Sequence, residues 1–106
     1  MSERERYILE LIRSTIIRKD PEAEIILFGS RATGNAHSEF DWDLLILLNN
    51  EYVNRKLEQE FRHALIDVEL ETGEAFSTFV FSKFDWENKY SITPFYLNIK
   101  NEGIRI

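Results

Sequence analysis

Residues 25–48 read IILFGSRATGNAHSEFDWDLLILL, and the two apolar runs in this segment decide the fold. The first run, residues 25–28, is short and ends at Gly29, which is typical of a buried strand. The second run is predicted as a strand over residues 40–48, where two acidic positions lead into a continuous apolar stretch. Residues 30–39 between them are polar and contain a Gly-Asn turn signal. The segment therefore predicts two buried strands joined by a loop.

A helix is predicted before this segment, over residues 3–18. Ser2 is a favourable N-cap residue, and Glu5 follows three positions later, as in a capping box. Positions on one helical face are then occupied by Ile8, Leu11, Ile12, Thr15 and Ile16. The helix is expected to end before Pro21, because a proline disfavours helical geometry in the residue before it.

A second helix is predicted after the segment, over residues 52–72. One face of it carries Leu57, Phe61, Leu65, Val68 and Thr72. Gly73 suits the left-handed position just past the end of a helix. A strand is the alternative, because residues 66–71 alternate between apolar and acidic side chains, and such a strand would form a hairpin with the residues that follow.

The last third of the chain is rich in aromatic residues. Residues 75–82 favour β-structure and predict a third strand. Residues 83–87 are expected to form a helical turn, and Thr93-Pro94 begins another helix that runs to Gly103. The order of helices and strands predicts one domain over residues 1–106, of the α/β or α+β class, with a small mixed sheet flanked by helices.

Composition limits the classes of function. A chain of 106 residues with 43% hydrophobic content can build one core. The absence of cysteine excludes disulfides, thiolate zinc sites and cysteine nucleophiles. A net charge of −6 argues against a nucleic acid as the main partner. The charged N-terminal residues, and the lack of an apolar run near the ~20 residues that span a bilayer, predict a soluble cytoplasmic protein without membrane contact.

Two aspartates at the start of the second strand are the first candidate site. Asp41 and Asp43 are two positions apart, so on a strand they point to the same side, while Trp42 points to the other. Adjacent carboxylates repel each other unless a cation or solvent reaches them. Mg²⁺ suits such a pair, because it accepts one or two protein carboxylates and completes its shell with water and phosphate oxygens. The alternative is that both acids only flank a strand at the surface.

The turn after the first strand is the second candidate. Gly29 lets a phosphate approach the backbone, and the amide groups that follow can donate to its oxygens together with the Ser30 hydroxyl. Arg31 adds a forked cationic donor for phosphate. This turn ends one strand and the acid pair opens the next, so neighbouring strands could bring both around one triphosphate.

Residues 27–34 and 38–46 together resemble the motif of the minimal nucleotidyltransferases of the polymerase-β superfamily, which runs Gly-Ser, a short loop and then Asp-x-Asp. The resemblance implies a polymerase-β-like nucleotidyltransferase fold. It also implies Mg²⁺-dependent transfer of a nucleoside monophosphate, AMP from ATP, to a hydroxyl of a protein or small molecule. Gly29 and Ser30 would hold the triphosphate. Asp41 and Asp43 would be the catalytic metal ligands.

The sequence departs from the family's pattern on the third strand. The family places a third carboxylate there, whereas this chain offers Ser77 or Thr78. Substitutes are Glu69, Glu71 and Glu74, if the hairpin alternative holds. A nucleotide-binding relative that has lost catalysis is therefore an alternative. The two histidines are weaker candidates: His37 lies in the loop between the motifs and His63 lies in the second predicted helix.

The resemblance also implies a protein partner. Minimal nucleotidyltransferases often pair with a small helical HEPN protein, as antitoxin and toxin, and the acceptor hydroxyl can belong to that partner. A binding function of this kind is compatible with the transferase function. In a domain of 106 residues, the acceptor site is expected to involve another chain.

Overall fold

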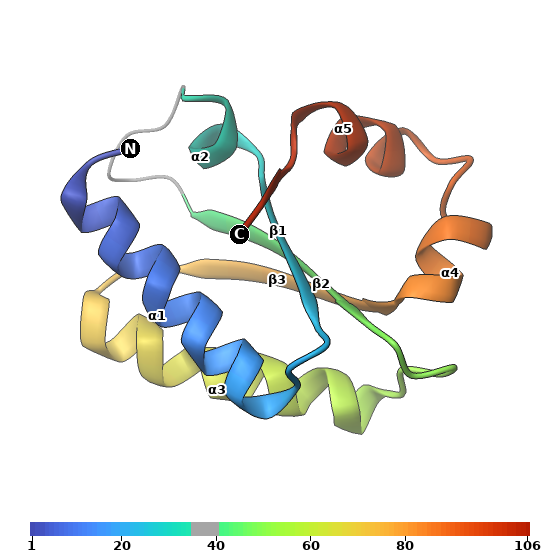
Figure 1. The fold of residues 1–106 in the computed structure, drawn as a ribbon, viewed down its shortest axis with the longest axis horizontal. Coiled ribbons are helices and arrows are strands. Elements are labelled where there is room, and N and C mark those ends of the chain that lie inside the picture. The colour runs from blue at the N-terminus through green and yellow to red at the C-terminus, as the bar shows by residue number, and fades with distance from the viewer. Residues whose placement is uncertain (35–40) are drawn as a thin grey trace.

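The computed structural model describes residues 1–34 and 41–106 and shows a mixed sheet with helices on both faces (Figure 1). The elements in chain order are α1 (Glu3–Lys19), β1 (Glu24–Phe28), α2 (Ser30–Thr33), β2 (Trp42–Leu48), α3 (Arg55–Thr72), β3 (Phe76–Ser82), α4 (Lys83–Asn88), α5 (Pro94–Glu102) and β4 (Ile104–Arg105). The predicted fold class, a small mixed sheet flanked by helices, is confirmed.

The sheet has the strand order β3-β2-β1-β4. Strand β1 pairs antiparallel with both β2 and β4, whereas β2 pairs parallel with β3. Antiparallel pairing puts the end of β1 beside the start of β2, and the register places Phe28 opposite Asp43. Parallel pairing puts the start of β3 at the same end, with Ser77 opposite Asp43. The candidate residues of three strands therefore meet at one end of the sheet.

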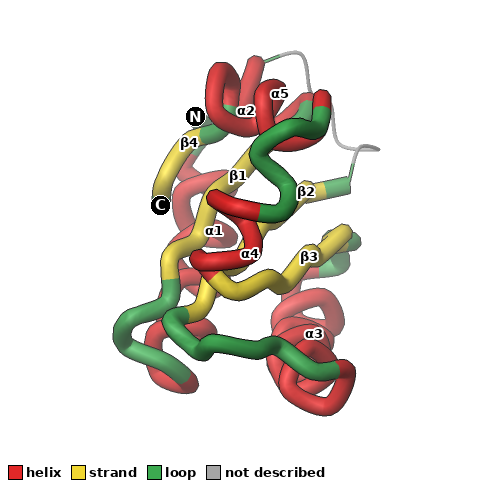
Figure 2. The backbone as a smooth tube through the Cα atoms, turned by 90° about the vertical axis from the view of Figure 1, so that its right-hand side faces the viewer, coloured by secondary structure: helices red, strands yellow, loops and turns green. Residues whose placement is uncertain are grey.

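Two hydrophobic layers hold the sheet between its helices. Helices α1 and α3 lie together on one face, while α4 and α5 lie on the other, as the two orthogonal views show (Figures 1 and 2). The larger layer is built from buried side chains of α1, α3 and the sheet, among them Ile8, Ile12, Ile16, Leu27, Trp42, Leu44, Ile46, Phe61 and Leu65. The smaller layer, under α4 and α5, contains Leu45, Leu47, Trp86, Tyr96 and Ile99. Strand β2 contributes to both, as its continuous apolar run predicts.

The predicted helix ends are largely confirmed. Ser2 and Glu5 form the complete capping box of α1. Gly73 ends α3 in the left-handed conformation, with φ of 75°. The Thr93 side chain caps α5 and Pro94 begins it. Helix α3 begins at Arg55 rather than near residue 52, because the Asn54 side chain accepts a hydrogen bond from the Leu57 amide and so caps it there.

Four details differ from the prediction. The hairpin alternative is wrong, because residues 66–71 continue α3 and their alternation has no structural counterpart. Strand β2 starts at Trp42, so Asp41 directly precedes it. The four-residue helix α2 lies within the predicted loop, and it is too short to give a periodic signal. Strand β4 has two residues and exists through pairing with β1 alone.

Residues 35–40, including the candidate His37, lie outside the described residues. Across residues 1–34 and 41–106, no helix is both long enough and apolar enough to cross a membrane.

Candidate functional site

Gly29 and Asp43 are in direct contact at the end of the sheet. Gly29 has φ of 71° and ψ of −156°, a conformation that side chains rarely permit. A Cβ added at Gly29 would collide with Oδ2 of Asp43 and would lie 3.2 Å from its Cγ. The lack of a side chain at residue 29 therefore makes room for the Asp43 carboxylate. The two halves of the sequence motif meet in this contact.

Asp41 and Ser77 complete the group on the same side. The Ser77 hydroxyl donates a hydrogen bond of 3.3 Å to Oδ2 of Asp41. Ser77 is also the sheet partner of Asp43, so this residue neighbours both aspartates. Thr78 pairs with Leu44, one position along the strands, and therefore points to the other face. Of the two predicted third positions, the structure places Ser77 at the acids.

The carboxylate of Asp43 lies in an unfavourable setting for a negative charge. Partial burial raises the pKa of Asp43 above its ordinary value, and the nearby negative charge of Asp41 raises it further. Asp41 itself is exposed. Among the described residues, no ion pair balances either aspartate. A bound cation would relieve both the repulsion and the cost of burial.

Arg31 lies on the opposite face of the sheet. Its side chain is 6% exposed and forms ion pairs with Glu74 at 3.5 Å and Glu5 at 3.9 Å. The guanidinium carbon lies 4.6 Å from the centre of the Trp42 ring, a cation–π distance. The structure therefore does not bring the Arg31 guanidinium together with Asp43, and the predicted phosphate contact of Arg31 stays a prediction.

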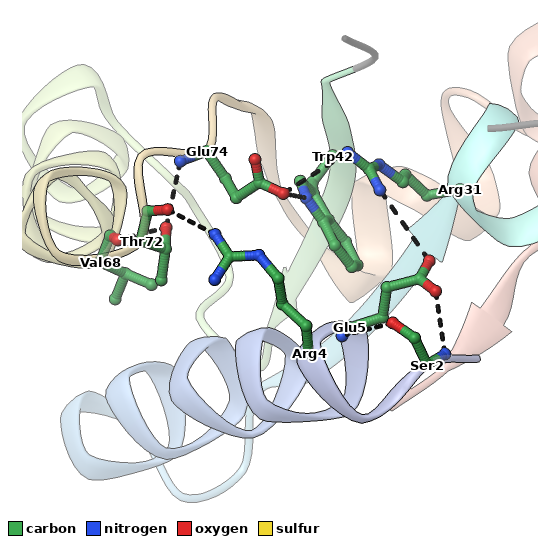
Figure 3. A network of polar contacts seen from close by, with 8 residues as sticks. All are labelled: Ser2, Arg4, Glu5, Arg31, Trp42, Val68, Thr72 and Glu74. Carbon is green, nitrogen blue, oxygen red and sulfur yellow. Dashed lines mark hydrogen bonds and ion pairs between the residues drawn. The ribbon is translucent and has the colours of Figure 1, made fainter. Parts of the chain in front are cut away.

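A polar network connects Arg31 to the strand that carries the acids (Figure 3). The Trp42 indole N–H donates to the same Glu74 carboxylate, at 3.3 Å. Glu5 in turn accepts from the backbone amide of Ser2 at the start of α1. Hydrogen bonding to Ser2, together with the Arg31 charge, lowers the pKa of Glu5. The network thus fixes Trp42, whose neighbours on both sides along the chain are the two aspartates.

No third carboxylate joins the aspartates within residues 1–34 and 41–106. Glu69 accepts a hydrogen bond from the Phe76 amide at 3.0 Å, and Glu74 is held by Arg31 and Trp42. Glu71 and His63 are exposed on α3. The proposed substitutes for a third acid therefore lie away from the pair.

Sequence reasoning missed the roles of Glu5 and Glu74 as partners of Arg31. Both glutamates are far from Arg31 along the chain, so only the tertiary fold brings them together. Their spacing gives no local signal. Burial of Trp42 on the face opposite the acids was predicted, and it is fully buried.

Comparison with protein families identifies one matching model. The model is described as a nucleotidyltransferase domain, and it matches residues 9–96. The match includes β1, β2 and β3, and with them Gly29, Asp43 and Ser77. It covers well over half of the chain.

A solved structure shares the fold. It is described as the crystal structure of a toxin-antitoxin with AMP-PNP, and it superposes with a TM-score of 0.58 at 17% sequence identity. The similarity covers 95% of this chain and 70% of that one. No curated protein matches the chain significantly. At this identity, the likeness concerns the fold.

Proposed function

Because the chain belongs to the nucleotidyltransferase domain family, we propose that it transfers AMP from ATP to a hydroxyl of a protein or small molecule, with release of pyrophosphate. The observation that carries the proposal is the contact between Gly29 and the Asp43 carboxylate. It puts a backbone turn suited to phosphate and a carboxylate suited to a cation side by side. A surface acid pair with no functional role would not require this contact.

The turn is proposed to hold the triphosphate. Gly29 leaves its backbone accessible, and the Ser30 amide and hydroxyl are hydrogen-bond donors. Within the described residues, the carbonyl of Gly29 accepts from the amides of Ala32 at 3.1 Å and Thr33 at 3.2 Å. These bonds fix the turn and so fix the direction of the Ser30 donors before a ligand binds.

The aspartates are proposed to hold Mg²⁺. Two carboxylates that share one side of a strand end fit the preference of this ion for one or two protein carboxylates, with water and phosphate oxygens as further ligands. Partial burial and the charge of Asp41 raise the pKa of Asp43, and a cation bound between the carboxylates would offset both effects. When bound, Mg²⁺ neutralises negative charge on the phosphate oxygens.

Ser77 limits the catalysis that the site can perform. A carboxylate at this position could accept a proton from the attacking hydroxyl, whereas a serine hydroxyl is not a base at neutral pH. General-base catalysis contributes about 10²- to 10⁴-fold to such reactions. We therefore expect slow transfer, and a nucleotide-binding relative without turnover is the second candidate function that Ser77 favours.

The acceptor is proposed to belong to a second protein. The similar solved structure is of a toxin-antitoxin, and this supports a role as the antitoxin-like partner of a helical HEPN protein. In that arrangement the hydroxyl that receives AMP lies on the partner, in the cytoplasm. The open side of the acid pair, where Asp41 is exposed, is the side from which such a hydroxyl would enter.

The test is a transfer assay with labelled ATP, Mg²⁺ and candidate acceptors, including a co-expressed helical partner. We expect label on the acceptor with the wild-type protein. The double variant Asp41→Asn, Asp43→Asn should transfer at least about 10³-fold more slowly, because it removes both metal ligands. Equal transfer by the double variant would refute the assignment of the site.

Calorimetry separates the two candidate functions. Mg²⁺-dependent ATP binding without transfer to any acceptor would identify the non-catalytic relative. ATP binding that does not depend on Mg²⁺ would contradict both candidate functions.

A further inference from the structure

Three phenylalanines from separate elements form a cluster near the acid pair. Phe28 lies on β1, Phe79 on β3 and Phe95 on α5. Their ring centroids are 6.0 Å apart for Phe28 and Phe79, 5.6 Å for Phe28 and Phe95, and 5.3 Å for Phe79 and Phe95. All three pairs are tilted or edge-on, the geometries that aromatic rings favour. We call this cluster the phenylalanine triad.

The triad begins beside the Asp43 carboxylate. Phe28 is the direct sheet partner of Asp43 on β1, and paired residues of antiparallel strands point to the same face. Ser77 is the partner of Asp43 on β3, and Phe79, two residues later, shares the face of Ser77. The Asp43 carboxylate, Phe28 and Phe79 therefore lie on the same face of the sheet, and Phe95 of α5 packs on that face against both rings.

Packing in the two hydrophobic layers does not explain why residue 79 is a phenylalanine. Phe28 and Phe95 pack against the smaller hydrophobic layer, whereas Phe79 is part of neither layer. Phe79 is 36% exposed although its ring contacts two others. A partly exposed aromatic ring can stack against a planar ligand.

We propose that the phenylalanine triad, with Phe79 as its open member, stacks against the nucleobase of the triphosphate. This inference rests on the proposed function, because the phosphates must lie at Gly29 and Asp43 for the base to reach the triad. Stacking on an aromatic side chain adds affinity for a nucleotide, and it tolerates every base because each has a π-face. The triad therefore supplies affinity for nucleosides, whereas the turn and the acids supply affinity for phosphate.

The experiment compares two ligands in the presence of Mg²⁺: a nonhydrolysable ATP analogue and inorganic tripolyphosphate, which has no base. Dissociation constants are measured by calorimetry for the wild type, Phe79→Leu and Phe79→Trp. Leucine keeps an apolar cover over the neighbouring rings and removes the aromatic face. The matched control is Phe84→Leu, because Phe84 is 68% exposed on α4 and lies outside the triad.

The expected result is selective for the base. Phe79→Leu should weaken binding of the ATP analogue about tenfold, the equivalent of 1.4 kcal/mol, and leave tripolyphosphate binding within about twofold. Phe79→Trp should bind the analogue at least as tightly as the wild type, and Phe84→Leu should change neither ligand. Melting temperatures are measured for all variants to check that each one is folded.

Two results would overturn the inference in distinguishable ways. If tripolyphosphate binds and Phe79→Leu binds the ATP analogue as tightly as the wild type, the base does not stack on the triad and the proposed function stands. If wild-type protein binds neither ligand, the proposed function itself fails, and the inference fails with it.

Discussion

Charged residues lie on both faces of the sheet at the end where β1 stops and β2 starts, and they are balanced differently. On the face of α1 and α3, the Arg31 guanidinium lies between two glutamates and over an indole ring. On the opposite face, the Ser77 hydroxyl donates a hydrogen bond to Asp41, and no ion pair reaches Asp41 or Asp43 among the described residues. One face has an arginine that pairs with its carboxylates, whereas within residues 1–34 and 41–106 no ion pair balances the aspartates on the other face. This difference supports the proposal that a cation binds at the second face.

The largest expected effect concerns the face that carries Arg31. Arg31→Met should lower the free energy of unfolding by about 3 kcal/mol, because it leaves two partly buried carboxylates without their cation. Arg62→Met is the matched control: Arg62 pairs with Glu58 at 2.9 Å but is exposed, so its loss should cost less than about 1 kcal/mol. Denaturant unfolding measures both, and equal losses would show that burial of the Arg31 network contributes nothing.

The next prediction tests the contact between Gly29 and the Asp43 carboxylate. Gly29→Ala should slow transfer about 100-fold, or about 2.7 kcal/mol, because the new Cβ must displace the Asp43 carboxylate. Gly34→Ala is the control, since Gly34 also has positive φ, at 81°, but no atom of the described residues lies within 4 Å of an added Cβ. The Gly34→Ala variant introduces backbone strain but no collision with Asp43, so its transfer rate should stay near that of the wild type. Similar rates for both variants would contradict the assigned contact.

A smaller effect is expected from adding a third acid. Ser77→Asp should raise the transfer rate about tenfold when Mg²⁺ is saturating, because it supplies a base beside the acid pair. Thr78→Asp puts the same charge on the other face and should give no increase. A Ser77→Asp rate at or below that of the wild type, in a folded variant, would argue that the missing carboxylate does not limit transfer.

The smallest effect concerns the charge of Asp43 itself. Because folding raises the pKa of Asp43 above 3.8, the folded state binds more protons at this carboxylate than the unfolded state does in the interval between 3.8 and the raised pKa. The free energy of unfolding therefore falls as pH rises through the interval between 3.8 and the raised value, and it stays reduced above that interval. Asp43→Asn removes this loss of unfolding free energy and should stabilise the metal-free protein by about 0.5 kcal/mol at pH 7.

The exposed Asp67 on α3 provides the control for this measurement, and Asp67→Asn should leave the melting temperature unchanged. Mg²⁺ should stabilise the wild type and not Asp43→Asn. A metal-free Asp43→Asn protein that melts below the wild type would contradict the claim that the charge of Asp43 destabilises the fold.

The same two faces show how far sequence reasoning reaches. The strands and the main helices follow from local patterns, because a buried strand, a glycine and an acid pair each leave a signal within a few residues. The contact of Gly29 with Asp43 was a hypothesis about neighbouring strands, and the antiparallel pairing of β1 with β2 produces it. The environment of Arg31 cannot be predicted from local patterns, since its glutamate partners come from the start of α1 and from the turn before β3. A sequence shows that an arginine can bind phosphate, whereas tertiary packing decides which anions it meets.

The triad and the short elements were also beyond local patterns. Phe28, Phe79 and Phe95 come from three elements, so the aromatic content of the last third gives no indication of which rings remain open. Strand β4 forms only because α5 returns the chain to the edge of β1. In each case, contacts between distant segments determine the structure.

The most direct measurement is a crystal structure of the protein with Mg²⁺ and a nonhydrolysable ATP analogue. The account predicts a metal ion about 2.0–2.1 Å from carboxylate oxygens of both Asp41 and Asp43, with the phosphates against the Gly29-Ser30 turn. Phosphates bound elsewhere, or aspartates that leave the metal uncoordinated, would contradict it.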